Sequence, residues 1–319
     1  MKRILLRIIL LLGTLAAAAE ERPFRLERDF GTLYGTLLVP DGEAETVALI
    51  IAGSGPTDRN GNNPLGSGAD AYRLLAEALH EAGIASLRYD KRAIGSSRLD
   101  DPSQLPLLTI DDYIADAAAL ADRLAAEGFR RVVLVGHSEG ALIALRAAQC
   151  SDAVAAVVTL AGPGYPMDEI LRLQLARQLA PARMDLLLEA EEIMTALERG
   201  ERVDMNYHAR ELFALFNPGI QTFWSSVFRY DPRREIRALQ CPVLIVGGDN
   251  DLQVPADNAA ALAAAQPRAG MVVIEGMTHT LKHSGSTSLD EQARTVYTDP
   301  ALPLADGLTE AIAGFIGAL

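Results

Sequence analysis

Gly-His-Ser-Glu-Gly, residues 136–140, separates two runs of different character. Residues 131–135 are apolar and mostly β-branched, which predicts a strand, and residues 141–148 are rich in alanine and leucine, which predicts a helix. A G-x-S-x-G motif between a strand and a helix predicts a turn sharp enough to lift the Ser138 hydroxyl clear of the sheet. Glycines flank the serine because side chains there would clash with the neighbouring strand and helix. Ser138 is therefore the candidate nucleophile.

The two residues beside the serine receive different interpretations. The backbone N–H of Glu139 stands at the start of the predicted helix, where it faces the negative charge that develops on a carbonyl oxygen under attack. We interpret Glu139 as one amide donor of an oxyanion hole. Neighbouring side chains of a strand point apart, so we interpret His137 as a structural residue of the turn.

The composition is that of an ordinary globular protein. Of its 319 residues, 49% are hydrophobic and 22% are charged, which provides enough apolar material for a sizeable core. This length allows one large domain or two. The net charge of −13 disfavours nucleic acid and anionic membrane surfaces as partners.

The N-terminus has the pattern of a signal peptide. Basic residues at positions 2, 3 and 7 accompany an apolar run, 8–15, and four alanines, 16–19. We predict a signal peptide at residues 1–19, cleaved after Ala19, and hence export to the periplasm or the medium without stable membrane insertion. The run is short for a membrane span, and an uncleaved anchor is the alternative.

From residue 46 to residue 160 predicted strands and helices alternate, which indicates a mostly parallel, doubly wound sheet with right-handed crossovers. Strands are predicted at residues 46–51, 84–89, 131–135 and 153–160, and helices at 69–83, 109–127 and 141–148. Before them, residues 24–30 and 32–39 predict two paired strands with Gly31 at the turn. Functional side chains in such sheets lie at the carboxyl ends of the strands.

A glycine-rich loop, residues 52–62, follows the predicted strand 46–51. The loop lacks G-x-G-x-x-G and the P-loop lysine, so it gives little support to a nucleotide site. Its position after a central strand is the one that supplies a second oxyanion-hole amide, and we assign that N–H to Ser54. A role in the turn alone is the alternative for Ser54.

The alternation stops between the predicted strands at 153–160 and 241–248. Predicted helices at 167–179, 182–199 and 206–215 indicate a helical cap at residues 164–237, inserted into a core made of residues 20–163 and 238–319. Aromatic residues gather in the cap, and Trp224, Phe223 and Phe228 are the candidates for the wall of a substrate pocket. The alternative is that they form the core of the cap itself.

Two aspartates and two histidines follow the last predicted strands. Asp249 and Asp251 both follow residues 241–248, and we favour Asp251 because Val254 can anchor the loop while Pro255 opens the next helix. Asp249 directly follows a glycine, and we interpret it as a turn residue that bonds amides of its own loop. After the strand at 271–275 we favour His279 over His283, because His279 follows the strand sooner. A last helix is predicted at 305–318.

The order Ser138, Asp251, His279 resembles that of the α/β-hydrolases, from about residue 30 to the end of the chain. Residues 53–62 (GSGPTDRNGN), 251–255 and 279–282 are similar to a narrower group of bacterial serine carboxylesterases. One departure is Ala93, where such hydrolases commonly have glycine.

The resemblance implies an α/β-hydrolase fold and a serine hydrolase for esters of small or medium acyl groups. A serine needs a histidine base, and a carboxylate fixes the tautomer of that histidine, so neither a metal nor an organic cofactor is required. A peptidase or aminopeptidase, a thioesterase or an acyltransferase would use the same residues. A non-catalytic binding protein on the same fold is the alternative of a different class.

Cys150 and Cys241 are the only cysteines. An exported protein could pair them, and the connectivity is not readable from the sequence. We expect two independent buried thiols. Their number and spacing do not form a metal-ligand motif.

Overall fold

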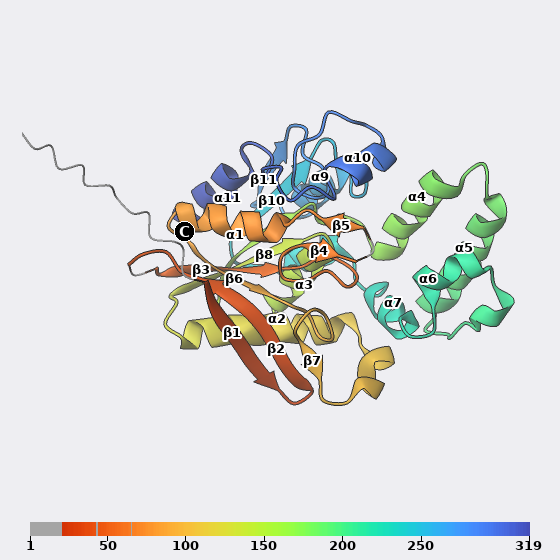
Figure 1. Cartoon of the computed structure of the whole chain (residues 1–319), viewed down its shortest axis with the longest axis horizontal. Helices are drawn as coiled ribbons and strands as arrows, with labels where there is room; N and C mark the ends of the chain where they lie inside the picture. Colours follow the sequence, from red (N-terminus) through yellow and green to blue (C-terminus); the bar gives the residue numbers. More distant parts are fainter. Residues whose placement is uncertain (1–20, 43, 65) are drawn as a thin grey trace, which may run out of the picture.

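A nine-stranded sheet forms the centre of the structure, a computed structural model that describes residues 21–42, 44–64 and 66–319. The predicted signal peptide lies outside the described residues. The strand order is β1 (Glu21–Arg28), β2 (Gly31–Leu38), β6 (Ala85–Tyr89), β3 (Thr46–Ile51), β8 (Arg131–His137), β9 (Val154–Leu160), β10 (Val243–Gly248) and β11 (Gly270–Ile274), with β7 (Arg98–Leu99) beside β2 (Figure 1). β2 is antiparallel to its neighbours β1, β6 and β7, and the other neighbouring pairs in this order are parallel.

Helices cover both faces of this sheet, which explains why its inner strands are continuous apolar runs. Every residue of β3 and β10 is buried. Figure 1 shows α1 and α2 on opposite sides of the sheet. Burying one Leu, Ile or Val side chain contributes about 1.5–3 kcal/mol, so the two apolar layers dominate the stability. One layer includes α1 (Ala71–Glu81) and α11 (Leu308–Gly317), and the other α2 (Ile110–Ala126), α3 (Glu139–Ala147), α8 (Pro232–Ala238) and α9 (Asp257–Ala265).

Between β9 and β10 the chain leaves the sheet and forms the predicted helical insertion. Figure 1 shows α4, α5, α6 and α7 together at one end of the molecule. They bury a hydrophobic cluster of their own, which includes Leu175, Ala190 and Phe216. The insertion contains α4 (Met167–Leu179), α5 (Met184–Glu198), α6 (Phe213–Phe216) and α7 (Gln221–Val227), and it leads into α8.

One predicted helix of the insertion, residues 206–215, is wrong. Two single 3₁₀ turns, Met205–Tyr207 and Arg210–Leu212, precede the short α6 there. The Glu189 carboxylate on α5 accepts hydrogen bonds from the Ala209 N–H and the His208 ring. Holding this segment extended against α5 satisfies the carboxylate and interrupts the helix.

Two further details differ from the sequence-based expectation. The hairpin turn is at residues 29–30, and Gly31 already belongs to β2. Gly31 has a φ of +141°, and a Cβ there would lie 2.2 Å from the Arg98 carbonyl oxygen of β7. An additional helix, α10 (Leu289–Thr295), follows the loop that contains His283.

The two cysteines are free thiols. Cys150 is exposed, so the expectation of two buried thiols is wrong for this residue, and Cys241 is half-buried. No helix in the described ranges combines the length and apolar character needed to span a bilayer.

Ala93 occupies a backbone conformation that favours glycine, with a φ of +61°. The left-handed region costs a residue with a Cβ about 1–2 kcal/mol, whereas glycine loses about 0.4–1 kcal/mol more entropy on folding. We therefore expect Ala93→Gly to raise the free energy of unfolding by about 0.5 kcal/mol in urea titrations.

The control is the same substitution at an ordinary helical position. Ala115 is exposed within α2, and Ala115→Gly should lower the free energy of unfolding by about 1 kcal/mol. Equal losses from both substitutions would contradict the strain at Ala93.

Candidate active site

Ser138 lies on the turn between β8 and α3, with a φ of 54° and a ψ of −124°. This conformation is strained for a non-glycine residue, at a cost of about 1–3 kcal/mol. The glycines on either side of it are needed because the surrounding backbone leaves no room for a Cβ. A Cβ on Gly136 would lie 2.1 Å from the Gly140 carbonyl oxygen, and a Cβ on Gly140 would lie 2.3 Å from the Ile51 carbonyl oxygen of β3. The close packing of strand and helix therefore holds the serine in its raised position.

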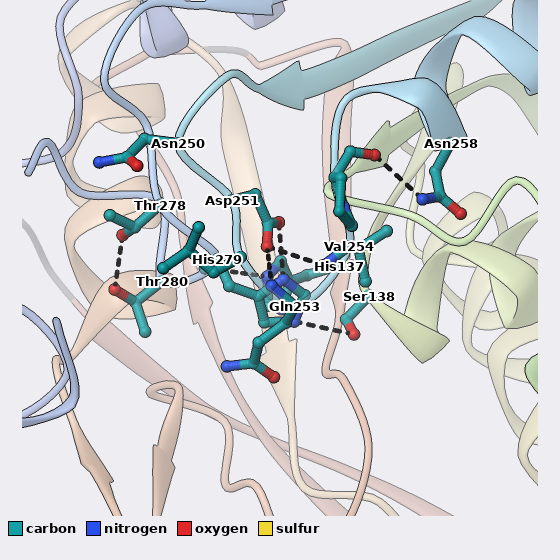
Figure 2. Close-up of polar contacts among 12 residues, drawn as sticks. His137, Ser138, Asn250, Asp251, Gln253, Val254, Asn258, Thr278, His279 and Thr280 are labelled. Carbon is teal, nitrogen blue, oxygen red and sulfur yellow. Dashed lines mark hydrogen bonds and ion pairs between the residues drawn. The ribbon is translucent and has the colours of Figure 1, made fainter. Parts of the chain in front are cut away.

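The structure brings Ser138, His279 and Asp251 together in one hydrogen-bonded line, which Figure 2 shows. His279 Nε2 lies 3.1 Å from Ser138 Oγ, and His279 Nδ1 lies 2.8 Å from Asp251 Oδ2. The side chains of Asp251 and His279 are nearly inaccessible to solvent, and Ser138 is half-buried. A carboxylate that accepts from Nδ1–H leaves Nε2 free to accept the serine proton.

The loop after β10 fixes the Asp251 carboxylate. Its Oδ1 accepts the N–H groups of Gln253 and Val254, each at 2.8 Å, while Oδ2 faces His279. Val254 is buried and anchors the loop, as its sequence position suggested. Carboxylates held by two amides keep one orientation, so the imidazole is oriented through Asp251.

The rival residues lie elsewhere. Asp249 accepts the Gly276 N–H at 2.6 Å. It therefore bonds the loop after β11 and not amides of its own loop, which corrects part of the sequence-based interpretation. His283 pairs with Met277, and its ring lies against Gly276, where a Cβ would meet His283 Cδ2 at 2.2 Å. Neither side chain is bonded to Ser138.

His137 has more connections than the turn residue expected from the sequence. Its Nε2 lies 2.7 Å from the His279 carbonyl oxygen, and its Nδ1 lies 2.7 Å from the Tyr72 hydroxyl. A carbonyl only accepts, so Nε2 carries the proton, Nδ1 accepts from Tyr72, and the Tyr72 oxygen accepts the Gly53 N–H at 3.0 Å. This chain of hydrogen bonds links the glycine-rich loop, the turn at Ser138 and the loop of His279.

Burial fixes the protonation states within this chain. It lowers the pKa of His137 to about 3, with the nearby His279 as a second cause, and it raises the pKa of Tyr72 well above its usual range. The imidazole of His137 is therefore neutral and the phenol of Tyr72 protonated at neutral pH. Both states are those that the direction of the hydrogen bonds requires.

The two residues assigned to an oxyanion hole are next in the chain to Ser138 and to Gly53, which packs against Ser138. Glu139 begins α3 directly after Ser138. Gly53 lies against the serine, because a Cβ on Gly53 would be 3.1 Å from Ser138 Cβ, and Ser54 follows it. Within the described ranges the N–H groups of Ser54 and Glu139 have no acceptor, as donors for a transient oxyanion require.

The three candidate pocket residues differ in their surroundings. Trp224 donates its indole N–H to the Leu215 carbonyl at 2.8 Å and stacks on Phe228, with ring centroids 5.5 Å apart. Both rings pack on the hydrophobic cluster of the insertion. Phe223 instead contacts Tyr113 on α2, at 5.5 Å between ring centroids. Phe223 and Phe228 both also pack against the core cluster on the α2 side of the sheet, whereas Trp224 packs on the cluster of the insertion.

A cavity of about 450 Å³ lies beside the glycine-rich loop and not at these aromatic residues. Pro56, Asn63 and Ile94 contribute to its wall. The described residues contain no group of three or more His, Cys, Asp or Glu side chains that could hold a metal ion.

The insertion also contacts the loop after β10. The Gln174 side chain of α4 donates to the Gln253 carbonyl at 3.1 Å, and Arg177 donates to the Leu252 carbonyl at 3.3 Å. Gly164, where the insertion begins, donates its N–H to Asn258 Oδ1 at 2.9 Å. The position of Asp251 is therefore coupled to the docking of the inserted helices.

A raised serine and a histidine–aspartate pair at the carboxyl ends of parallel strands define the architecture of an α/β hydrolase. Residues 49–295 match the model of the Alpha/beta hydrolase family. The chain belongs to this family, and the predicted fold class is confirmed.

Two curated relatives are similar over most of the chain. The chain is 29% identical over 215 residues to RutD, a putative carbamate hydrolase of Klebsiella pneumoniae (63% of this chain, 76% of the relative). It is 28% identical over 267 residues to a homoserine O-acetyltransferase of Deinococcus radiodurans (74% of this chain, 75% of the relative).

Solved structures share the fold at lower identity. Est1E from Butyrivibrio proteoclasticus, solved with ferulic acid, is similar with a TM-score of 0.58 at 19% identity, covering 92% of this chain and 98% of that one. An esterase from Pyrococcus furiosus gives a TM-score of 0.58 at 16% identity, covering 94% and 91%.

The lowered pKa of His137 makes stability depend on pH. The unfolded chain binds a proton at this histidine below about pH 6.5, whereas the folded protein does so only near pH 3. The free energy of unfolding should therefore fall as the pH drops through this window, by up to about 1.4 kcal/mol per pH unit from this group.

His137→Gln should remove that contribution while its amide can still donate to the His279 carbonyl. We expect the stability curves of the two proteins, from urea unfolding between about pH 7 and 4, to converge as the pH falls. Parallel curves would show that His137 is not held neutral by folding.

Proposed function

We propose that this protein is a serine hydrolase that cleaves carboxylic esters of small or medium acyl groups through an acyl-enzyme. The observation that carries the proposal is the line from Ser138 Oγ through the His279 ring to the Asp251 carboxylate. The esterases among the structures with this fold, and the relatives named as a putative carbamate hydrolase and a homoserine O-acetyltransferase, fit the same chemistry.

The first half of the proposed reaction forms the acyl-enzyme. His279 Nε2 removes the proton from Ser138 Oγ as the oxygen attacks the ester carbonyl, and Asp251 stabilises the resulting imidazolium. The carbonyl oxygen becomes an oxyanion that the N–H groups of Ser54 and Glu139 receive, each worth about 3 kcal/mol. The tetrahedral intermediate then expels the alcohol, which takes its proton from His279.

Water completes the reaction by the same steps. His279 removes a proton from a water molecule that attacks the acyl carbonyl, and the carboxylic acid leaves as Ser138 recovers its proton. An acyltransferase would admit an alcohol in place of that water, and the acetyltransferase relative favours it as the second candidate function. The distinction lies in which acceptor reaches the acyl-enzyme.

We further propose that residues 164–237, apart from α8, which packs on the sheet, act as a cap that limits access to small substrates. The hydrogen bonds from α4 to the loop of Asp251 support this position. We favour Phe223 as the pocket residue, because its ring contacts Tyr113 on α2, whereas Trp224 bonds the Leu215 carbonyl within the insertion and Phe228 stacks on Trp224. Export through the N-terminal signal remains part of the proposal.

The test is turnover of a panel by the protein without residues 1–19. The panel contains acyl esters of increasing chain length, thioesters, aminoacyl amides and carbamates, each with and without an alcohol acceptor. We expect ester hydrolysis to dominate and Ser138→Ala to abolish it, since the substitution removes the nucleophilic oxygen and leaves the turn. His279→Ala should be comparably inactive, and its control, His283→Ala, should keep most activity. Turnover in Ser138→Ala equal to that of the wild type would refute the proposal.

The two aspartates after β10 provide a matched pair. Asp251→Asn should lower kcat by about 10⁴, the size of this effect in a well-studied triad, because the amide favours the wrong histidine tautomer. Asp249→Asn should lower mainly the free energy of unfolding, by about 1 kcal/mol, through its weaker bond to Gly276. Steady-state kinetics and urea unfolding of both variants measure the effects on kcat and on the free energy of unfolding separately. The reverse pattern would make Asp249 the carboxylate that orients the histidine.

A further inference from the structure

Two buried side chains hold the peptide groups of Gly53 from opposite directions. The N–H of Gly53 donates to the Tyr72 hydroxyl at 3.0 Å, and its carbonyl oxygen accepts from Lys91 Nζ at 2.5 Å. Tyr72 and Lys91 are both nearly inaccessible to solvent. Glycine has the widest backbone freedom of any residue, so partners on both sides are needed to give Gly53 one conformation.

The carbonyl of Gly53 and the N–H of Ser54 belong to the same peptide group. That group is planar and trans, so the C=O and the N–H point in opposite directions. The lysine that fixes the Gly53 carbonyl therefore fixes the direction of the Ser54 N–H as well. This N–H is the loop donor of the proposed oxyanion hole, and Gly53 itself lies against Ser138.

Lys91 also reaches the side chain of Glu139, the residue whose N–H is the second assigned donor. Its ammonium lies 3.3 Å from Glu139 Oε1, and both side chains are 1% exposed. Glu139 contributes its own backbone N–H to the hole. The ammonium also lies over the ring of Tyr113, 5.1 Å from the ring centroid.

We propose that Lys91 is a positioning residue for catalysis, which aims the Ser54 N–H through the Gly53 carbonyl and ties it to Glu139 across the oxyanion hole. This inference rests on the proposed function. In this role the loop after β6, which carries Lys91, has to hold the ammonium at the Gly53 carbonyl, although the two residues are 38 positions apart in the sequence. The ammonium does not touch the reacting atoms, because its described partners are Gly53, Glu139 and the Tyr113 ring.

Lys91→Met is the first test, because methionine fills a similar volume and donates no hydrogen bond. The readouts are kcat and KM for the ester that the wild type cleaves fastest, and the inhibition constant of phenylboronic acid, which forms a tetrahedral adduct on a serine. We expect kcat to fall by about 10- to 100-fold and the boronic acid to bind weaker by a similar factor. KM should change by no more than about threefold, because the donor acts mainly in the transition state.

A purely structural role would lower stability and leave these readouts unchanged. The matched control is Gln266→Leu, since Gln266 is also buried and donates to two backbone carbonyls, at the far end of α9 from Asp257. It should lower the melting temperature without changing kcat or boronic acid affinity. Lys91→Met with the kcat and inhibition constant of the wild type, measured well below its melting temperature, would overturn the proposal.

Two further variants cover a failure of Lys91→Met to fold. The double variant Lys91→Met with Glu139→Gln removes both buried charges and should show the same loss of kcat and inhibitor affinity. Tyr72→Phe removes the opposite partner of Gly53 without any charge, and we expect kcat to fall by about two- to tenfold. If only Tyr72→Phe folds, a kcat equal to that of the wild type overturns the proposal.

The outcome is separable from that of the proposed function. If the wild type cleaves none of the esters in the panel, the function fails, whatever Lys91 does. If the wild type cleaves esters and the Lys91 variants cleave them equally well, only the positioning role fails.

Discussion

The close approach of α3 to β3 and β8 is the constraint on which the site depends. Backbone carbonyls occupy the space where a Cβ of Gly136 or Gly140 would lie, and this packing allows the chain to reverse within one residue at Ser138. The free energy that this strain costs is small compared with the stabilisation from apolar burial in the sheet around the serine. A rigid interior therefore keeps a sparsely populated backbone conformation, and the serine oxygen remains raised at the carboxyl edge of the sheet.

Parallel strands then bring the other groups to the same edge. β3 ends at the glycine-rich loop, β10 at the loop of Asp251 and β11 at the loop of His279. Tyr72 and His137 join the glycine-rich loop to the loop of His279, and the Asp251 carboxylate joins the loop after β10 to the His279 ring. Because His137 bonds the backbone of His279 and Asp251 bonds its ring, the loop and the side chain of the proposed base are fixed by separate contacts.

The sequence was sufficient for the parts of the structure that local patterns determine. The strand–turn–helix around Ser138, the start of α2 at Thr109, whose N–H bonds Asp112, and the choice of Asp251 and His279 for the histidine–aspartate pair all agree with the geometry. Lys91 was not identified because its partners are distant in the sequence. The broken helix at 206–215 has the same origin, since its cause is a carboxylate on another helix.

The position of Lys91 bears on how the proposed oxyanion hole would obtain its electrostatic strength. An unpaired ammonium near a developing oxyanion would stabilise it through charge, but this ammonium is paired with a buried carboxylate at 3.3 Å and bonded to a carbonyl. Its field at the substrate is therefore largely cancelled by Glu139. A buried ion pair is also a poor source of stability, because desolvation offsets most of the attraction. What remains is direction: in our proposal the pair orients amide dipoles whose strength comes from the peptide groups, and the hole would work through orientation and not through added charge.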